Sequence, residues 1–141
     1  MITLERGILE QMVKQARQEL PNECCGILAG QKNGEDTEII DIYPLKNIDQ
    51  SPEHFSMDPK EQFEAYYAIR DRGLKLLGNY HSHPATPSRP SREDIRLAHD
   101  PEALYAILSL AGTDPVLKFF RIKEGLPGEI PLFIKEKPHG I

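Results

Sequence analysis

The sequence predicts an α/β or α+β fold, in which helices pack on a β-sheet. Three observations predict it: helical and strand patterns alternate through the first two thirds, mainly strands follow, and neither an internal repeat nor a linker divides the chain. A length of 141 residues, with 39% hydrophobic and 28% charged residues, is typical of a globular domain. We therefore expect one domain over residues 1–141.

The first elements are predicted to be a helix and a β-hairpin. Thr3 is a suitable N-cap for a helix that runs to about Leu20, because apolar residues recur at four-residue spacing and Pro21 then stops the helix. Small apolar residues over 24–31 predict a buried strand. A polar turn follows, and 37–44 alternates as the returning strand would.

The second helix has clear start and stop signals. After a short predicted strand at 54–57, Asp58 stands at the N-cap position and a proline occupies the first helical position. Glu61 lies where a capping box would place it. The helix is expected to end at Arg72, with Gly73 as the residue after its C-cap.

The rest of the chain is predicted to be a central strand, a loop, a short helix and more strands. The central strand covers 74–83, and prolines exclude regular pairing over 84–90. Ser91 opens a short helix that ends before Asp100. Three further strands are expected at 102–110, 116–122 and 129–135.

A candidate metal site lies at the end of the central strand. His81 and His83 are two residues apart, so on a strand both imidazoles point to one face. Asp94, carried back by the loop, would complete two nitrogens and one oxygen around a divalent ion. The fourth position is left for water, as in a catalytic zinc site, which predicts a metallohydrolase.

These residues also have simpler interpretations. Two nearby histidines are a weak signal alone, and Ser91 with Asp94 resembles a capping box. The capping role is compatible with metal binding, because a helix N-terminus favours the carboxylate form. A hydrolase also needs a base. Glu93 should face away from the site, whereas Glu23, just before a buried strand, could reach across the sheet end.

The two cysteines are expected to be packing residues. Cys24 and Cys25 are neighbours, so on a strand they point to opposite faces and do not form a disulfide. Two thiols are also too few for a cysteine-rich zinc site. Burial in a strand of small apolar residues is the stronger interpretation.

Composition restricts the partners. A formal net charge of −5 without a basic run argues against nucleic-acid binding. The longest apolar runs are too short to cross a bilayer, so no membrane partner is expected. The N-terminus lacks the pattern of a signal peptide, which makes a cytoplasmic location the expectation. The residues do not determine an oligomeric state.

Three segments together resemble the JAMM (MPN+) zinc metalloproteases, in their compact prokaryotic form. They are Glu23 with the strand after it, His-Ser-His-Pro at 81–84, and Ser-Arg-Glu-Asp at 91–94. The resemblance implies a cytidine-deaminase-like α/β/α arrangement around a mixed sheet. It also implies that His81, His83 and Asp94 bind Zn²⁺.

The resemblance further implies two catalytic roles and a substrate class. Glu23 would take a proton from the attacking water and return it to the leaving amine, and Ser91 would stabilise the oxyanion. The substrate would be an amide bond after the C-terminal Gly-Gly of a ubiquitin-like or sulfur-carrier protein, including a newly made cysteine on such a carrier. The alternative is a non-catalytic MPN-type binding or scaffold module. Deamination ranks last, since it needs a Pro-Cys-x-x-Cys segment.

Overall fold

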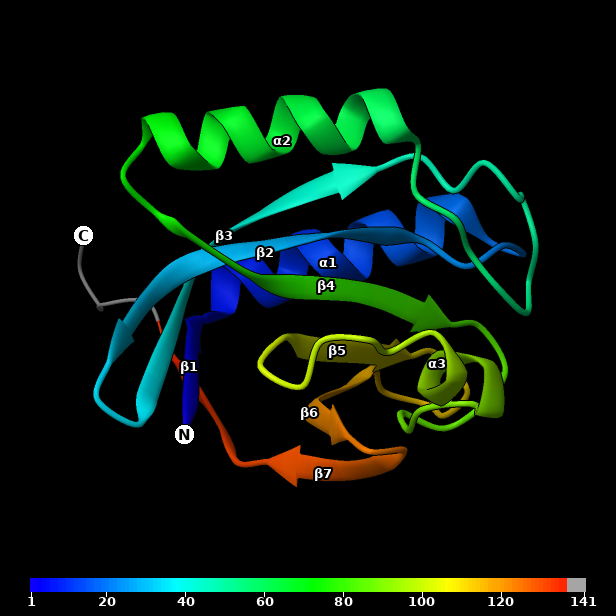
Figure 1. Cartoon of the computed structure of the whole chain (residues 1–141). Coiled ribbons are helices and arrows are strands. Elements are labelled where there is room, and N and C mark those ends of the chain that lie inside the picture. Colours follow the sequence, from blue (N-terminus) through cyan, green and yellow to red (C-terminus); the bar gives the residue numbers. More distant parts are fainter. Residues whose placement is uncertain (137–141) are drawn as a thin grey trace.

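The structure is a computed structural model that describes residues 1–136, and it contains one mixed sheet with helices on both faces (Figure 1). The elements in chain order are β1 Ile2–Glu5, α1 Arg6–Glu19, β2 Cys25–Asn33, β3 Asp36–Leu45, α2 Pro59–Asp71, β4 Lys75–His83, α3 Arg92–Arg96, β5 Leu104–Ser109, β6 Val116–Lys123, β7 Leu126–Ile130 and β8 Leu132–Lys135.

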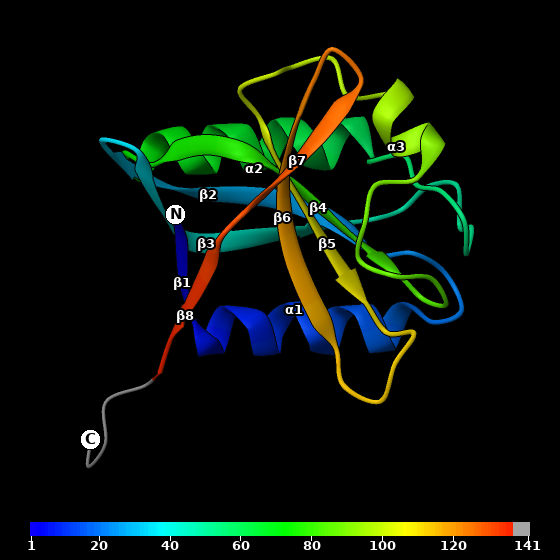
Figure 2. The same cartoon turned by 90° about the horizontal axis from the view of Figure 1, so that it is seen from below.

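The sheet is curled, and its two edges are joined by consecutive strands. The strand order is β7-β6-β5-β4-β2-β3-β1-β8, with β4 at the centre and parallel to β5. Only Pro131 separates β7 from β8, although they form opposite edges. The backbone N–H of Ile2 donates to the carbonyl of Pro131 at 2.9 Å. Figure 2 shows the chain passing directly from one edge to the other.

Each face of the sheet has its own apolar core. On one face Ile8, Met12 and Ala16 of α1 belong to the larger buried cluster, and Ala65 and Ile69 of α2 belong to a second cluster. Figure 2 shows α1 and α2 on either side of the strands. Residues of β2 alternate between the two clusters, because successive side chains of a strand point to opposite faces. The mixed sheet flanked by helices confirms the predicted fold class.

A glycine lets α1 pack closely on the strands that carry the candidate site. A Cβ at Gly26 would lie 2.3 Å from the Tyr80 ring, so the ring can cross β2 only where no side chain stands. The Tyr80 hydroxyl then donates to Oε1 of Gln15 at 2.5 Å, and Nε2 of Gln15 donates to the carbonyl of Cys25 at 2.9 Å. These contacts tie the helix to both β2 and β4.

The predicted N-terminus of the first helix is wrong. Residues 2–5 form β1, and α1 begins at Arg6 with Glu5 as an N-cap that makes no side-chain hydrogen bond. Thr3 therefore caps nothing. Its neighbours Ile2 and Leu4 are buried as a strand requires, and β1 pairs in parallel with β3 and β8. Those partners lie far away in sequence, so a local pattern does not reveal them.

The entry to α2 also differs from the prediction. Asp58 caps the helix by accepting from the backbone N–H of Lys60 at 3.0 Å. Glu61 does not complete a capping box; its carboxylate accepts from the backbone N–H of Lys46 at 2.6 Å. The short strand expected at 54–57 is reduced to one bridge, between Asn47 and Met57.

The remaining elements follow the predictions closely, with one exception. The strand expected at 129–135 is two strands, β7 and β8, because Pro131 cannot donate to a ladder and the chain changes sheet edge there. Among residues 1–136, no helix has the length and apolar character needed to span a membrane.

Candidate metal centre

The end of β4 and the start of α3 bring three predicted ligands together. Nε2 of His81 lies 3.1 Å from Nε2 of His83 and 3.2 Å from Oδ2 of Asp94. The remaining pair, His83 Nε2 and Asp94 Oδ2, is separated by 3.3 Å. The three atoms form a nearly equilateral triangle, and both histidines are buried.

The capping box of α3 holds Asp94 in this position. Ser91 is the N-cap, and its Oγ accepts from the backbone N–H of Asp94 at 3.0 Å. In return the backbone N–H of Ser91 donates to Oδ2 of Asp94 at 2.8 Å. The same carboxylate oxygen faces both imidazoles. A single position of the Asp94 side chain is therefore compatible with both the capping and the metal-binding interpretation.

The triangle has the dimensions of a metal site. Zinc lies about 2.0–2.2 Å from nitrogen and oxygen ligands, so neighbouring ligands of a tetrahedral ion are about 3.3–3.5 Å apart. The three separations of 3.1, 3.2 and 3.3 Å are close to that spacing. Two imidazole nitrogens that face each other need a proton or a cation between them. The donor set fits a divalent ion.

Two contacts that the sequence analysis missed orient the imidazoles. Nδ1 of His83 lies 2.8 Å from the carbonyl of Pro87, which leaves Nε2 for a metal. The ring of Phe55 stacks on His81 with 4.6 Å between centroids. Nδ1 of His81 is buried without a hydrogen-bond partner among the described residues. Phe55 has no local signal, because its role depends on a loop that returns over β4.

The charges of the triangle are coupled. Burial raises the pKa of Asp94, but hydrogen bonds with both imidazoles outweigh it and hold that pKa well below the usual range. Burial lowers the pKa of His81. For His83, the hydrogen bonds with Asp94 and Pro87 outweigh burial and raise the pKa. Asp94 therefore stays a carboxylate, which is the form that binds a cation.

Glu23 is buried beside this centre, and its backbone is held on three sides. Its N–H donates to the carbonyl of Ser51 at 2.8 Å, and its carbonyl accepts from Nδ2 of Asn47 at 3.0 Å. The next N–H, that of Cys24, donates to Oγ of Ser82 at 2.8 Å. The structure thus reveals a positioning role for Ser82, the residue between the two histidines.

The Glu23 carboxylate is set apart by its surroundings. Only 4% of the residue is exposed, and Oε1 has no hydrogen-bond partner among residues 1–136. Burial raises the pKa of Glu23 to about 8, His83 opposes this effect, and Asp94 adds to it. A bound water that donates to this buried oxygen would supply the hydrogen bond that it lacks.

Asn47 is a second residue that the sequence analysis missed. Its buried side chain donates to the carbonyls of Glu23 and His54 and accepts from the backbone N–H groups of Asp49 and Ser56. It therefore ties Glu23 to the loop that carries Phe55. Every one of these bonds is with backbone, so the residue type alone did not reveal it.

Two cavities border the three ligands. Glu23, His83 and Ser91 line a cavity of about 890 Å³. His81 and Asp94 line another, of about 240 Å³, whose other walls are mainly apolar and include Phe55 and Tyr105. Each of the five predicted site residues thus lines one of these two cavities, and Glu93 lines neither.

The cysteines do not take part in this centre. Both are buried free thiols, and burial raises the pKa of Cys24 to about 11 and that of Cys25 to about 12. A thiol with such a pKa is a poor nucleophile at neutral pH. The predicted packing role is confirmed, since Cys24 and Cys25 belong to the two different apolar clusters.

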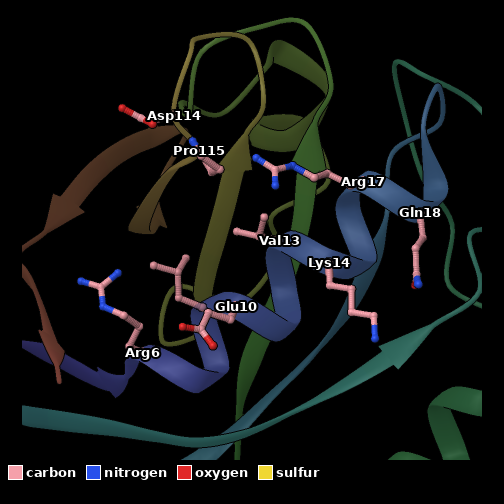
Figure 3. Close-up of a pocket in the computed structure, with 9 residues that line it drawn as sticks. Arg6, Glu10, Val13, Lys14, Arg17, Gln18, Asp114 and Pro115 are labelled. Carbon is pink, nitrogen blue, oxygen red and sulfur yellow. The ribbon is translucent and has the colours of Figure 1, made fainter. Parts of the chain in front are cut away.

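A further cavity lies between α1 and the loop from β5 to β6. Its volume is about 770 Å³, and Figure 3 shows side chains of α1, among them Arg6, Lys14 and Arg17, on one wall and Asp114 and Pro115 on the other. None of the three candidate ligands borders it. This cavity is therefore not part of the candidate metal centre, despite its volume.

Comparison with known proteins agrees with this geometry. The family described as prokaryotic homologs of the JAB domain matches residues 5–123. A CysO-cysteine peptidase from Mycobacterium tuberculosis is 33% identical over 139 residues, which cover 96% of this chain and 92% of the relative. A probable TtuB-protein conjugate cleaving protease from Thermus thermophilus is 35% identical over 122 residues, covering 85% and 75% respectively. A solution structure of a protein from Desulfitobacterium hafniense has a TM-score of 0.90 and 52% identity, and covers 99% of this chain and 96% of that one.

Proposed function

Because the chain belongs to the family of prokaryotic homologs of the JAB domain, we propose that it is a zinc-dependent peptidase or isopeptidase. Its substrate is an amide bond after the C-terminal Gly-Gly of a ubiquitin-like or sulfur-carrier protein. The observation that carries the proposal is the triangle of His81, His83 and Asp94 next to a buried Glu23, whose Oε1 has no hydrogen-bond partner within residues 1–136.

Zinc is the ion that the donors favour. Two imidazole nitrogens and one carboxylate oxygen at tetrahedral spacing, with room for a further ligand, are typical of catalytic zinc sites. His81, His83 and Asp94 would hold it. When bound, the ion supplies Lewis acidity, which lowers the pKa of water and polarises the scissile carbonyl.

The residues of the chain do the proton transfer and orientation. Glu23 takes a proton from the attacking water and passes it to the leaving amine; a pKa near neutrality suits both steps. Oγ of Ser91 accepts from the Asp94 N–H, so its own hydrogen is available to the developing oxyanion. The Asn47 and Ser82 contacts keep the Glu23 backbone in place.

The names of the relatives support the substrate class. The mycobacterial relative is a CysO-cysteine peptidase, and the Thermus relative is a probable protease of TtuB-protein conjugates. Each name describes cleavage of a bond between a carrier and its attached group. We propose a cytoplasmic location as well.

The test combines metal analysis with cleavage of carrier fusions. We expect close to one zinc per chain and zinc-dependent cleavage of CysO or TtuB fusions engineered with Gly-Gly before the scissile bond. Glu23→Gln should keep its zinc and lose about 10²- to 10⁴-fold in kcat. Glu35→Gln, the same change on an exposed residue in the turn between β2 and β3, is the control and should retain activity. Retained turnover in Glu23→Gln would remove Glu23 from the mechanism.

A further inference from the structure

The position of Glu23 distinguishes the two cavities that border the metal centre. The larger cavity is lined by Glu23, His83 and Ser91, and the smaller one by His81 and Asp94 without Glu23. In hydrolysis the carbon–nitrogen bond of the amide breaks, a carbon–oxygen bond to water forms, and a proton moves to the departing nitrogen. The group that returns this proton must lie next to that nitrogen.

The larger cavity therefore receives the leaving amine, and we call it the leaving-group cavity. Its lining residues are Leu20, Pro21, Glu23, Pro52, Glu53, His83, Pro84, Ala85, Thr86 and Ser91. The acyl side of the substrate is left for the smaller cavity. A volume of about 890 Å³ gives room for several residues beyond the scissile bond.

The leaving-group cavity is lined by carboxylate side chains but by no lysine or arginine. Two of its lining residues are glutamates, Glu23 and Glu53. Glu53 is exposed, and its carboxylate makes no ion pair or hydrogen bond with any residue in the described part of the chain. Apart from the zinc ion of the proposed function, a free carboxylate on the leaving group would find no cation among these side chains, and it would face the negative charge of Glu53.

This reasoning identifies the leaving group by its charge. We infer that the leaving-group cavity selects an amine within a longer chain, such as a lysine side chain or a peptide without a nearby carboxylate, over a free amino acid. The inference rests on the proposed function and narrows its substrate class. The inferred bond differs from the one that the name of a relative, the CysO-cysteine peptidase, specifies. Glu53 is the residue that determines the preference.

A matched pair of substrates tests the inference. CysO with Gly-Gly and then one cysteine is prepared in two forms, with the cysteine carboxylate free or as its amide. At low ionic strength we expect kcat/KM to be about fivefold higher for the amide, the effect of two like charges about 4 Å apart in a water-like medium. The same carrier joined to the Nε of a lysine peptide should be cleaved at least as well as the amide.

Variants of Glu53 then identify the source of the preference. Glu53→Gln should bring the amide-to-acid ratio of kcat/KM toward one, and Glu53→Lys should reverse it. Glu35→Gln is the matched control, because Glu35 is exposed in the turn between β2 and β3 and should keep the wild-type ratio. A ratio taken within one protein cancels differences in folding and zinc loading.

The outcomes separate this inference from the proposed function. Cleavage by the wild type with a ratio near one, or a ratio that Glu53→Gln and Glu53→Lys leave unchanged, would overturn the inference alone. Failure of the zinc-loaded wild type to cleave any of the three substrates would overturn the proposed function, and the inference with it.

Discussion

Glu23 combines two properties that conflict in a folded protein. The proposed proton acceptor must be able to ionise, yet this carboxylate is buried and its Oε1 has no hydrogen-bond partner in the described part of the chain. Burial accounts for most of the rise of its pKa to about 8. The surrounding structure tolerates the acid because Ser51, Asn47 and Ser82 hold the backbone at this point.

The stability of the metal-free protein should report this pKa. The ordinary pKa is 4.5, and the folded value is about 8. The folded state therefore holds its proton more tightly than the unfolded state does. The protonated Glu23 carboxyl group stabilises the folded state fully when the pH is below its pKa in the unfolded chain. This stabilisation is lost as the pH rises to its pKa in the folded protein. Since one pKa unit corresponds to about 1.4 kcal/mol, the wild type should lose a few kcal/mol over that interval relative to Glu23→Gln.

Urea unfolding of the metal-free wild type and Glu23→Gln across this pH interval measures the difference. Both proteins retain His81, His83 and Asp94, so their curves differ by the titration of Glu23 together with its coupling to His83 and Asp94. Glu35→Gln should follow the wild-type curve. Parallel curves for Glu23→Gln and the wild type would show that the pKa of Glu23 is not raised in the folded protein.

At the level of the element, α3 has five residues and owes its position to its first turn. The capping box joins Ser91 and Asp94 through both backbone and side-chain atoms. The same residues face the imidazoles and the leaving-group cavity. Helix capping and the proposed catalysis therefore depend on one pair of side chains, and we expect a substitution to affect both.

Two N-cap variants separate these contributions. Ser91→Ala should cost about 1 kcal/mol of stability as a lost N-cap and also lower kcat about 10²- to 10³-fold as a lost oxyanion donor. Asp58→Ala removes the N-cap of α2, which accepts from Lys60, and should cost similar stability with kcat unchanged. Denaturation midpoints and kcat with the amide substrate test this. Equal loss of kcat in both variants would mean that Ser91 acts only through folding.

For the whole molecule, the curled sheet gathers distant segments at one end of the central strand. Glu23 precedes β2, the two histidines end β4, and Asp94 starts α3. These segments are neighbours because β2 and β4 pair antiparallel, with Cys25 opposite His81. A metal ion at the triangle would therefore connect parts of the chain that are far apart in sequence, and its removal should affect global stability.

Zinc should raise the melting temperature. A ligand at a hundred times its Kd stabilises the folded state by about 2.7 kcal/mol, which corresponds to about 8 °C for a chain of this length. A chelator should reverse the shift. His83→Ala should melt at the same temperature with and without zinc, whereas His99→Ala, an exposed histidine outside the triangle, should keep the shift. A wild type that is insensitive to both zinc and chelator would favour the non-catalytic scaffold alternative.

The elements that were predicted well are those with local causes. The run of small apolar residues in β2, the alternation of β3, the Asp58 cap of α2 and the prolines after His83 act within a few residues. The predictions that were wrong depend on remote partners. Thr3 lies in a strand because β3 and β8 pair with it, and Glu61 turns to the Lys46 backbone instead of its own helix.

The candidate ligands could be predicted from the amino-acid sequence alone. Spacing on a strand decides that His81 and His83 share a face, and the first turn of a helix decides that Ser91 orients Asp94. The burial of Glu23, the stacking of Phe55 on His81 and the separate cavities were decided only by the folded molecule. The physical reason is range: backbone geometry operates over a few residues, whereas desolvation and the charge of a cavity depend on which distant segments close around a side chain.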